Sequence, residues 1–180
     1  QGDSNTLVGY QAGKAITTGS TNTIVGSAAG KALTTASSNV LLGKSAGAAA
    51  TTAQRNVIVG MNAVGVGVLA NATGAQGKYN IVVGTDAGED LATGYSNVLV
   101  GDSAGKELTD GQDNIAIGAF ALDAANAGEH YNIAIGTNTL GAETSGADGC
   151  VAIGHHALLA QNRAESGNTA VGFEAGKAIP

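Results

Sequence analysis

The chain has 180 residues with a formal net charge of −6, and it contains 29 Gly, four Tyr, two Phe and no Trp. This small number of aromatic side chains argues against a conventional globular core. Small residues must therefore pack in thin, regular layers. Residues 1–85 carry a charge of +4 and residues 86–180 carry −10, with no basic stripe, which argues against a nucleic-acid partner. No apolar run is long enough to insert into a membrane.

A five-residue phrase, Asn followed by three mostly apolar residues and Gly, recurs along the whole chain. Successive closing glycines are 17, 17, 17, 24, 17, 17, 18, 18 and 18 residues apart, and such a period is the signature of a solenoid. We therefore predict an all-β fold, a parallel β-solenoid (β-roll) of about ten 17–18-residue coils, in one repeat domain over residues 1–180. The phrases begin at Asn5, Asn22, Asn39, Asn56, Asn80, Asn97, Asn114, Asn132, Cys150 and Asn168.

Counting the Asn as position zero, positions one to three of each phrase read as a short strand. Successive side chains of a strand alternate between its two sides, and here both sides are apolar. One narrow coil encloses only one interior, so we expect the second side to contact another chain. Position two changes from Leu, Ile or Val in the first six coils to Ala in the last four. We interpret that change as a shift in packing between chains.

After each Gly comes a bend of the form x-x-Ala-Gly or x-x-Ala-Leu, and then a turn rich in Thr, Gly and Ser. The recurring Asn side chains, from Asn5 to Asn168, are expected to form a ladder of amides hydrogen-bonded from coil to coil. Cys150 replaces Asn in this ladder, and we interpret it as a small buried residue because free cysteines commonly behave so. As the only Cys, it excludes an intrachain disulfide.

The interval of 24 marks a seven-residue insertion in the fourth coil, within residues 64–78. Insertions in repeat proteins lie in surface loops, often on a binding face. The insertion therefore leaves two alternatives open, a decorative loop or a contact site for a cell-surface glycan or protein.

The two ends of the chain are in register with each other, because a second copy placed after the first would continue the repeat without a break. In such a junction Phe173 would stack on Tyr10, and Ile179 on Ile16. Open strand edges favour pairing with another chain. We expect either end-to-end stacking of protomers or a piece of a longer repeat.

Sequence motifs of known chemistry give no convincing site. Residues 43–47 and 101–105 match the nucleophile pattern G-x-S-x-G, but both Ser occupy a repeat position that elsewhere holds Gln, Asp, Phe or Glu. Carboxylates lack the spacing of a calcium loop. We therefore expect no catalytic residues, no cofactor and no metal site.

The stretches N-T-L-V-G-Y-Q-A-G-K-A-I-T-T-G-S and N-I-A-I-G-T-N-T-L resemble the repeats of trimeric autotransporter adhesin heads and of phage tail fibres. The resemblance covers essentially the whole chain and concerns scaffold positions only. It implies a homotrimer located outside the cell, on a cell surface or on a virion, without enzymatic activity. We expect a structural module of a surface fibre, with a receptor-binding adhesin head as the alternative.

Overall fold

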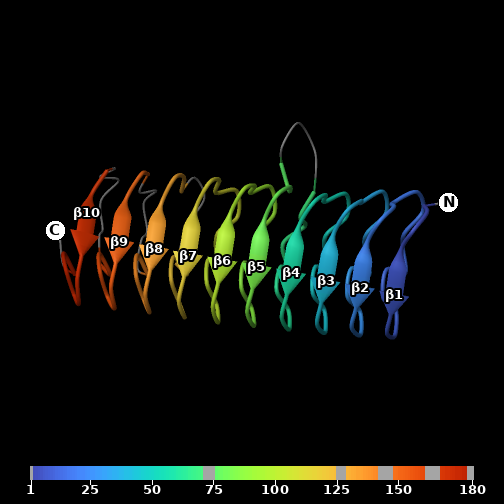
Figure 1. The fold of residues 1–180 in the computed structure, drawn as a ribbon, viewed down its shortest axis with the longest axis horizontal. Helices are drawn as coiled ribbons and strands as arrows, with labels where there is room; N and C mark the ends of the chain where they lie inside the picture. The colour runs from blue at the N-terminus through green and yellow to red at the C-terminus, as the bar shows by residue number, and fades with distance from the viewer. Residues whose placement is uncertain (1, 71–75, 125–128, 142–147, 161–166, 178–180) are drawn as a thin grey trace.

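The computed structural model describes residues 2–70, 76–124, 129–141, 148–160 and 167–177. They form one sheet of ten parallel strands in sequence order (Figure 1). The predicted all-β parallel solenoid is therefore confirmed. No helix that could span a membrane occurs among these residues. The strands are β1 (Thr6–Val8), β2 (Thr23–Val25), β3 (Val40–Leu42), β4 (Val57–Val59), β5 (Ile81–Val83), β6 (Val98–Val100), β7 (Ile115–Ile117), β8 (Ile133–Ile135), β9 (Val151–Ile153) and β10 (Thr169–Val171).

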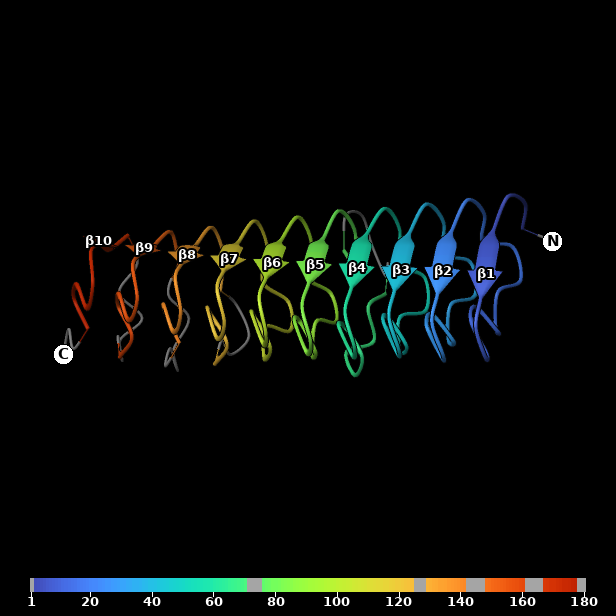
Figure 2. The same ribbon diagram turned by 60° about the horizontal axis from the view of Figure 1, so that its bottom comes forward.

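Equivalent positions of the phrase lie side by side in neighbouring coils, as in the pair Val82 and Leu99. The peptide N–H at position one donates to the Asn carbonyl of the next coil, and the Gly N–H donates back to position three. Between β6 and β7 these bonds are Val98 N to Asn114 O and Gly118 N to Val100 O, both 2.8 Å. Figure 2 shows the resulting rod, in which each coil lies against the coils before and after it.

The closing Gly of every phrase has a backbone conformation that other residues rarely adopt, with φ between 128° and 147°. Neighbouring coils also approach too closely there for a side chain. A Cβ on Gly84 would lie 2.1 Å from the carbonyl oxygen of Gly101 in the next coil. The backbone conformation applies to all ten closing glycines, and the close approach to the next coil applies to the first nine.

Position two of each strand points into the coil, and positions one and three point outward. In β2 to β9 the position-two side chain is at most 1% exposed. Our interpretation that this row packs between chains is therefore wrong. The interior beneath it is filled by the Ala of the following bend and by a Leu of the return segment, such as Ala104 and Leu108 around Leu99. The position-two side chains pack inside the solenoid of the same chain.

The change from Leu to Ala at position two has a cause inside the coil. A Cβ on Gly105, at the bend of the sixth coil, would lie 2.8 Å from Cδ2 of Leu99, so Leu99 leaves room only for Gly at that bend. The fourth coil differs, because Ile58 is combined there with a buried Val64 at the bend. In the seventh, eighth and ninth coils, where the strand carries Ala, the bend carries a buried Leu with φ of 48–55°, close to the glycine conformation. The Leu at the bend thus fills the interior space that the strand side chain fills in the earlier coils. The swapped pairs are Ala116 with Leu122, Ala134 with Leu140, and Ala152 with Leu158. The tenth coil combines Ala170 with Gly176.

The insertion of the fourth coil leaves and rejoins the solenoid by hydrogen bonds to the next coil. Gly67 N donates to Glu89 O at 2.8 Å, and Gly77 N donates to Thr93 O at 3.2 Å. Val66 and Val68, on either side of Gly67, are 60% and 53% exposed. The central residues 71–75 lie outside the described part of the chain.

Candidate interaction face

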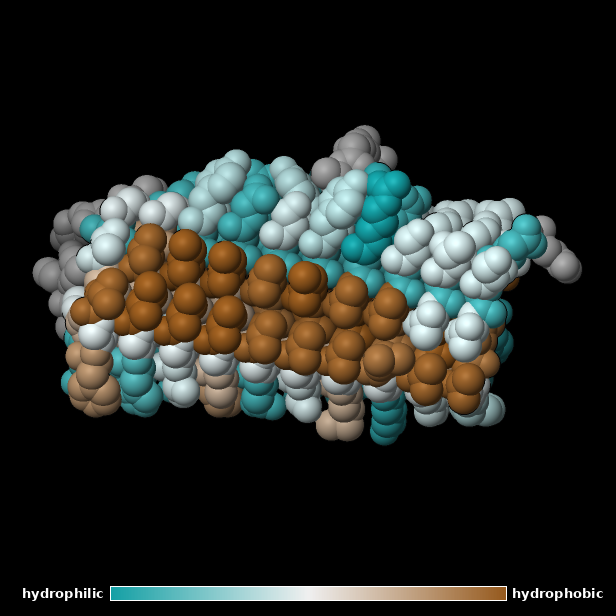
Figure 3. Space-filling view, viewed as in Figure 1, coloured by the Kyte–Doolittle hydropathy of each residue, from teal (hydrophilic) through white to brown (hydrophobic). Residues whose placement is uncertain are grey.

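Positions one and three of the ten strands form two outward rows, which we call the outer rows. Figure 3 shows them as a continuous apolar band along the rod. The band leaves large side chains in solvent, for example Ile81 at 44% and Ile117 at 39% exposed. Soluble monomers rarely expose so long an apolar surface, which usually marks a contact site. The outer rows are Thr6, Thr23, Val40, Val57, Ile81, Val98, Ile115, Ile133, Val151 and Thr169 at position one, and Val8, Val25, Leu42, Val59, Val83, Val100, Ile117, Ile135, Ile153 and Val171 at position three.

The outer rows form a rigid surface because nearly every side chain in them is β-branched. Such side chains have few rotamers, so they lose little conformational entropy when a partner covers them. Their backbone is held by the parallel ladder on both sides in β2 to β9. The band contains no ionisable residue. A partner would therefore cover it without removing a charge from water.

Two columns of solvent-accessible side chains border the outer rows. The leading column precedes the Asn of each coil, and the trailing column follows the Gly, so the strand lies between them. The leading column is Ser4, Thr21, Ser38, Arg55, Tyr79, Ser96, Asp113, Tyr131, Gly149 and Gly167. The trailing column is Tyr10, Ser27, Lys44, Met61, Thr85, Asp102, Ala119, Thr137, His155 and Phe173.

Several bordering side chains are fixed by contacts along the rod. In the leading column, Arg55 Nη1 donates to the Tyr79 hydroxyl at 2.6 Å, and the guanidinium lies 5.5 Å from the centre of that ring. In the trailing column, the rings of His155 and Phe173 stack with centroids 5.4 Å apart and an angle of 12°. Both borders thus carry ordered ring systems beside the apolar band.

The predicted asparagine positions lie in one column directly before the strands. Asn97 is typical: its side-chain Nδ2 donates to Asn80 Oδ1 at 3.1 Å and to Gly111 O at 2.8 Å, and its backbone N–H also donates to Asn80 Oδ1. The same side-chain contact links successive asparagines from Asn5 to Asn114. Those between Asn22 and Asn132 are at most 1% exposed. This column is a buried structural element of the rod.

Cys150 occupies the asparagine column and is fully buried. Its backbone N–H donates to Asn132 Oδ1 at 2.9 Å, as an Asn there would. Its thiol lies 4.0 Å from Asp148 O and brings no amide to the column. The carboxamide pattern is therefore interrupted at the ninth coil.

The residues predicted to meet at the chain ends lie at opposite ends of the rod. Tyr10 and Phe173 are each 75% exposed, and Ile16 packs partly against the core. Ile179 lies outside the described residues. The single chain does not bring these side chains together, so the end-to-end contact remains a prediction.

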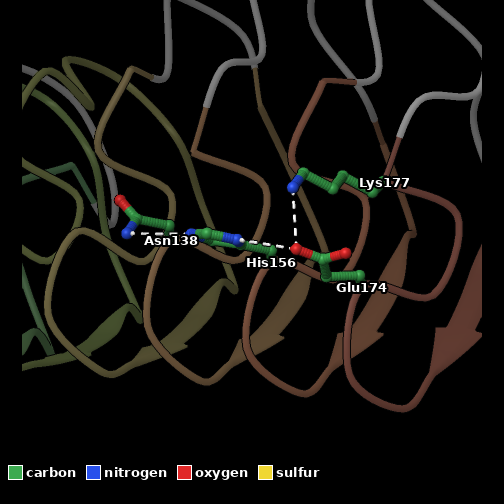
Figure 4. A network of polar contacts seen from close by, with 4 residues as sticks. All are labelled: Asn138, His156, Glu174 and Lys177. Carbon is green, nitrogen blue, oxygen red and sulfur yellow. Dashed lines mark hydrogen bonds and ion pairs between the residues drawn. The ribbon is translucent and has the colours of Figure 1, made fainter.

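A polar network joins the last three coils next to the trailing column (Figure 4). His156 lies between Asn138, at 3.4 Å, and the Glu174 carboxylate, at 3.6 Å. Lys177 Nζ donates to the same Glu174 oxygen at 2.7 Å. The hydrogen bond from Lys177, assisted by His156, lowers the pKa of Glu174 below its ordinary value. In the described ranges, no three His, Cys, Asp or Glu side chains gather closely enough to hold a metal ion.

Two further ionisable groups have shifted pKa values. The pKa of Lys106 is raised by its hydrogen bond and charge contact with Glu89, 3.4 Å away. Burial raises the pKa of Asp123 from 3.8 to about 6, and its Oδ1 is buried without a hydrogen bond. Both groups lie at the bend side of their coils.

Sequence reasoning assigned the contact surface to position two and so missed the outer rows. A signal was present: position one holds Thr6, Thr23 and Thr169, whereas position two holds no hydroxyl in any coil. A strand position that holds Thr in several coils is expected to face solvent, because Thr is mostly exposed in folded proteins. The sequence also did not identify Gly149 and Gly167 of the leading column as candidate contact residues, because that assignment depends on the space around them.

The described geometry consists of a buried amide column, an apolar band and two bordering columns. No protein-family model matches the chain, and no curated protein or solved structure matches it either.

Proposed function

We propose that the chain is a non-enzymatic structural module of a fibre on a cell surface or virion, and that it associates with itself, as a homotrimer, through the outer rows. The observation that supports this is the continuous apolar band, which runs along all ten strands and carries no charge. The stoichiometry of three comes from the resemblance to trimeric adhesin heads and tail fibres.

The size of the band is sufficient to drive association. Ten strands spaced about 4.8 Å apart, with side chains covering a width of about 10 Å, give a footprint of roughly 500 Å² per chain. At about 25 cal/mol per Å², covering that area yields about 12 kcal/mol per chain. Association costs on the order of 4–15 kcal/mol, so the band can offset it where each chain meets two others.

The proposal is tested by measuring the molar mass of the chain by analytical ultracentrifugation across a range of concentrations. We expect three chains per particle for the unaltered protein. Val100→Lys places a charge in an outer row of the sixth coil and is expected to give monomers. Glu107→Lys, in the same coil but outside the face, is the matched control and should leave the mass unchanged. A monomer at all concentrations would refute the proposal.

The proposal extends to the two ends of the rod. At the first coil, an open hollow of about 630 Å³ has Leu7 and Ile16 in its wall, and at the last coil Val171 and Phe173 are exposed. In-register stacking would cover both surfaces, whether the next coil belongs to a second copy or to further repeats of the same polypeptide. Ile16→Asp, in the wall of the hollow and outside both bordering columns, is expected to weaken any end-to-end filament seen by negative-stain electron microscopy and to leave the lateral trimer intact.

Adhesion to a cell-surface glycan or protein is a second candidate function. It is favoured by Val66 and Val68, which the insertion holds more than half exposed beside the regular coils. If the insertion binds a partner, replacing both residues by Ser should reduce binding to cells or glycan arrays without changing the molar mass. Equal binding by the variant would argue against this candidate.

A further inference from the structure

Two glycines of the leading column, Gly149 and Gly167, have open space where a side chain would be. Among the described residues, a Cβ added to either would meet no atom within 4 Å. Their φ angles of 67° and 81° do not explain them fully, because the eight other residues of the column adopt φ between 55° and 62° with full side chains. Tyr79 and Tyr131 are among those eight. Neither crowding nor backbone conformation therefore requires Gly at these two coils.

The same two coils carry the aromatic pair of the trailing column. His155 and Phe173 stack on each other at the opposite edge of the strand, and Phe173 is 75% exposed. The two edges of β9 and β10 are therefore complementary in shape. The edge at the start of these strands has a gap, and the edge at their ends has a projecting pair of rings.

Cyclic symmetry about an axis parallel to the rod brings two different edges together. The trailing edge of one chain then meets the leading edge of the next at the same coil level, and the ring of contacts closes. An antiparallel pair would instead place each column against itself. We infer, on the basis of the proposed self-association, that the His155–Phe173 pair of one chain packs into the gap over Gly149 and Gly167 of a second, parallel copy.

The remaining coils are compatible with this pairing. Same-level pairs of the leading and trailing columns place no two like charges together: Arg55 faces Met61, Asp102 faces Ser96, and Asp113 faces Ala119. Where the leading residue is Tyr79 or Tyr131, the trailing residue is the smaller Thr85 or Thr137. At these two coils a large leading side chain thus meets a smaller trailing one, which is the reverse of the arrangement at Gly149 and Gly167.

The first test is disulfide trapping in a Cys150→Ala background. Gly167→Cys and Phe173→Cys in one chain are separated by β10 and its two flanking residues. These five residues alone span about 13 Å, which is too far for an intrachain bond. We expect mild oxidation to yield a covalent cyclic trimer from the double variant and no covalent oligomer from either single variant. A protein of trimer mass that gives no such product would overturn this inference alone. A monomeric protein would overturn the proposed function as well.

The second test fills the gap. Gly167→Tyr introduces a residue that the same column already holds at Tyr79 and Tyr131, so each chain should still fold. We expect it to weaken trimer formation at least tenfold, and Phe173→Gly in the same chain to restore it. Thr21→Tyr, opposite the small Ser27, is the matched control and should leave the trimer intact. Equal trimer affinity for Gly167→Tyr and the unaltered chain would contradict the inferred contact.

Discussion

The exchange of volume between strand and bend makes a quantitative prediction at the sixth coil. Leu99 is fully buried, so Leu99→Ala leaves a cavity and should cost about 3 kcal/mol of unfolding free energy. Gly105→Leu alone should cost about 2 kcal/mol, because its Cβ would lie 2.8 Å from Leu99. Together the two changes recreate the Ala and Leu arrangement of the next coil, with Ala116 and Leu122. The double variant should lose only about 2 kcal/mol, a coupling of about 3 kcal/mol.

The assay is urea unfolding followed by circular dichroism at one fixed protein concentration, because association would make stability depend on concentration. Leu99→Ala combined with Gly30→Leu is the matched control. Those two sites lie four coils apart and share no contact, so their effects should add to about 5 kcal/mol. If the Leu99 and Gly105 changes add in the same way, the compensating exchange does not explain the alternation between the two coil types.

Three further predictions concern single sites. Cys150→Asn should raise the unfolding free energy by about 1 kcal/mol in urea unfolding, since it restores the amide column, whereas Cys150→Ala should not raise it. Gly84→Ala should cost at least about 3 kcal/mol, because its Cβ would lie 2.1 Å from the next coil's carbonyl oxygen. Gly149→Ala has open space among the described residues, so it should cost only about 1 kcal/mol, from its positive φ alone. Equal losses would contradict the packing argument. Because burial raises the pKa of Asp123 to about 6, the folded chain binds this proton more tightly than the unfolded chain. The resulting stabilisation is present below about pH 4 and is lost as the pH rises through about 6, so Asp123→Asn should flatten that decline in Tm.

The solenoid could be predicted because a fixed period and a closing Gly leave few alternatives for the backbone. The period places equivalent residues in register, and the positive φ at the Gly needs no knowledge of neighbouring side chains. The direction of each strand side chain was harder, because both sides are apolar and alternation alone does not say which side is the interior. The deciding residues, Ala104 of the bend and Leu108 of the return segment, share the buried core with Leu99, and only the structure shows that they lie on the position-two side of the strand.

The candidate site could be predicted only in part for a related reason. An asparagine ladder follows from the repeat itself. The gap over Gly149, by contrast, is visible only when the atoms around it are in place, because a leading-column Gly has the same letter whether it is crowded or open. Contacts between chains depend on such empty space, and a single sequence does not record it.

The exchange between strand and bend also has a consequence for how repeats of this type are recombined. The coils beginning at Asn114, Asn132 and Cys150 share the Ala and Leu arrangement and are all 18 residues long. A crossover between coils of the two kinds is harmless if it falls in the turn, because strand and bend are then inherited as one unit. A crossover between position two and the bend of the sixth and seventh coils produces either two Leu side chains or none. Viable chimeras of these two coils should therefore have their junctions in the turns, where each whole coil is transferred as one unit.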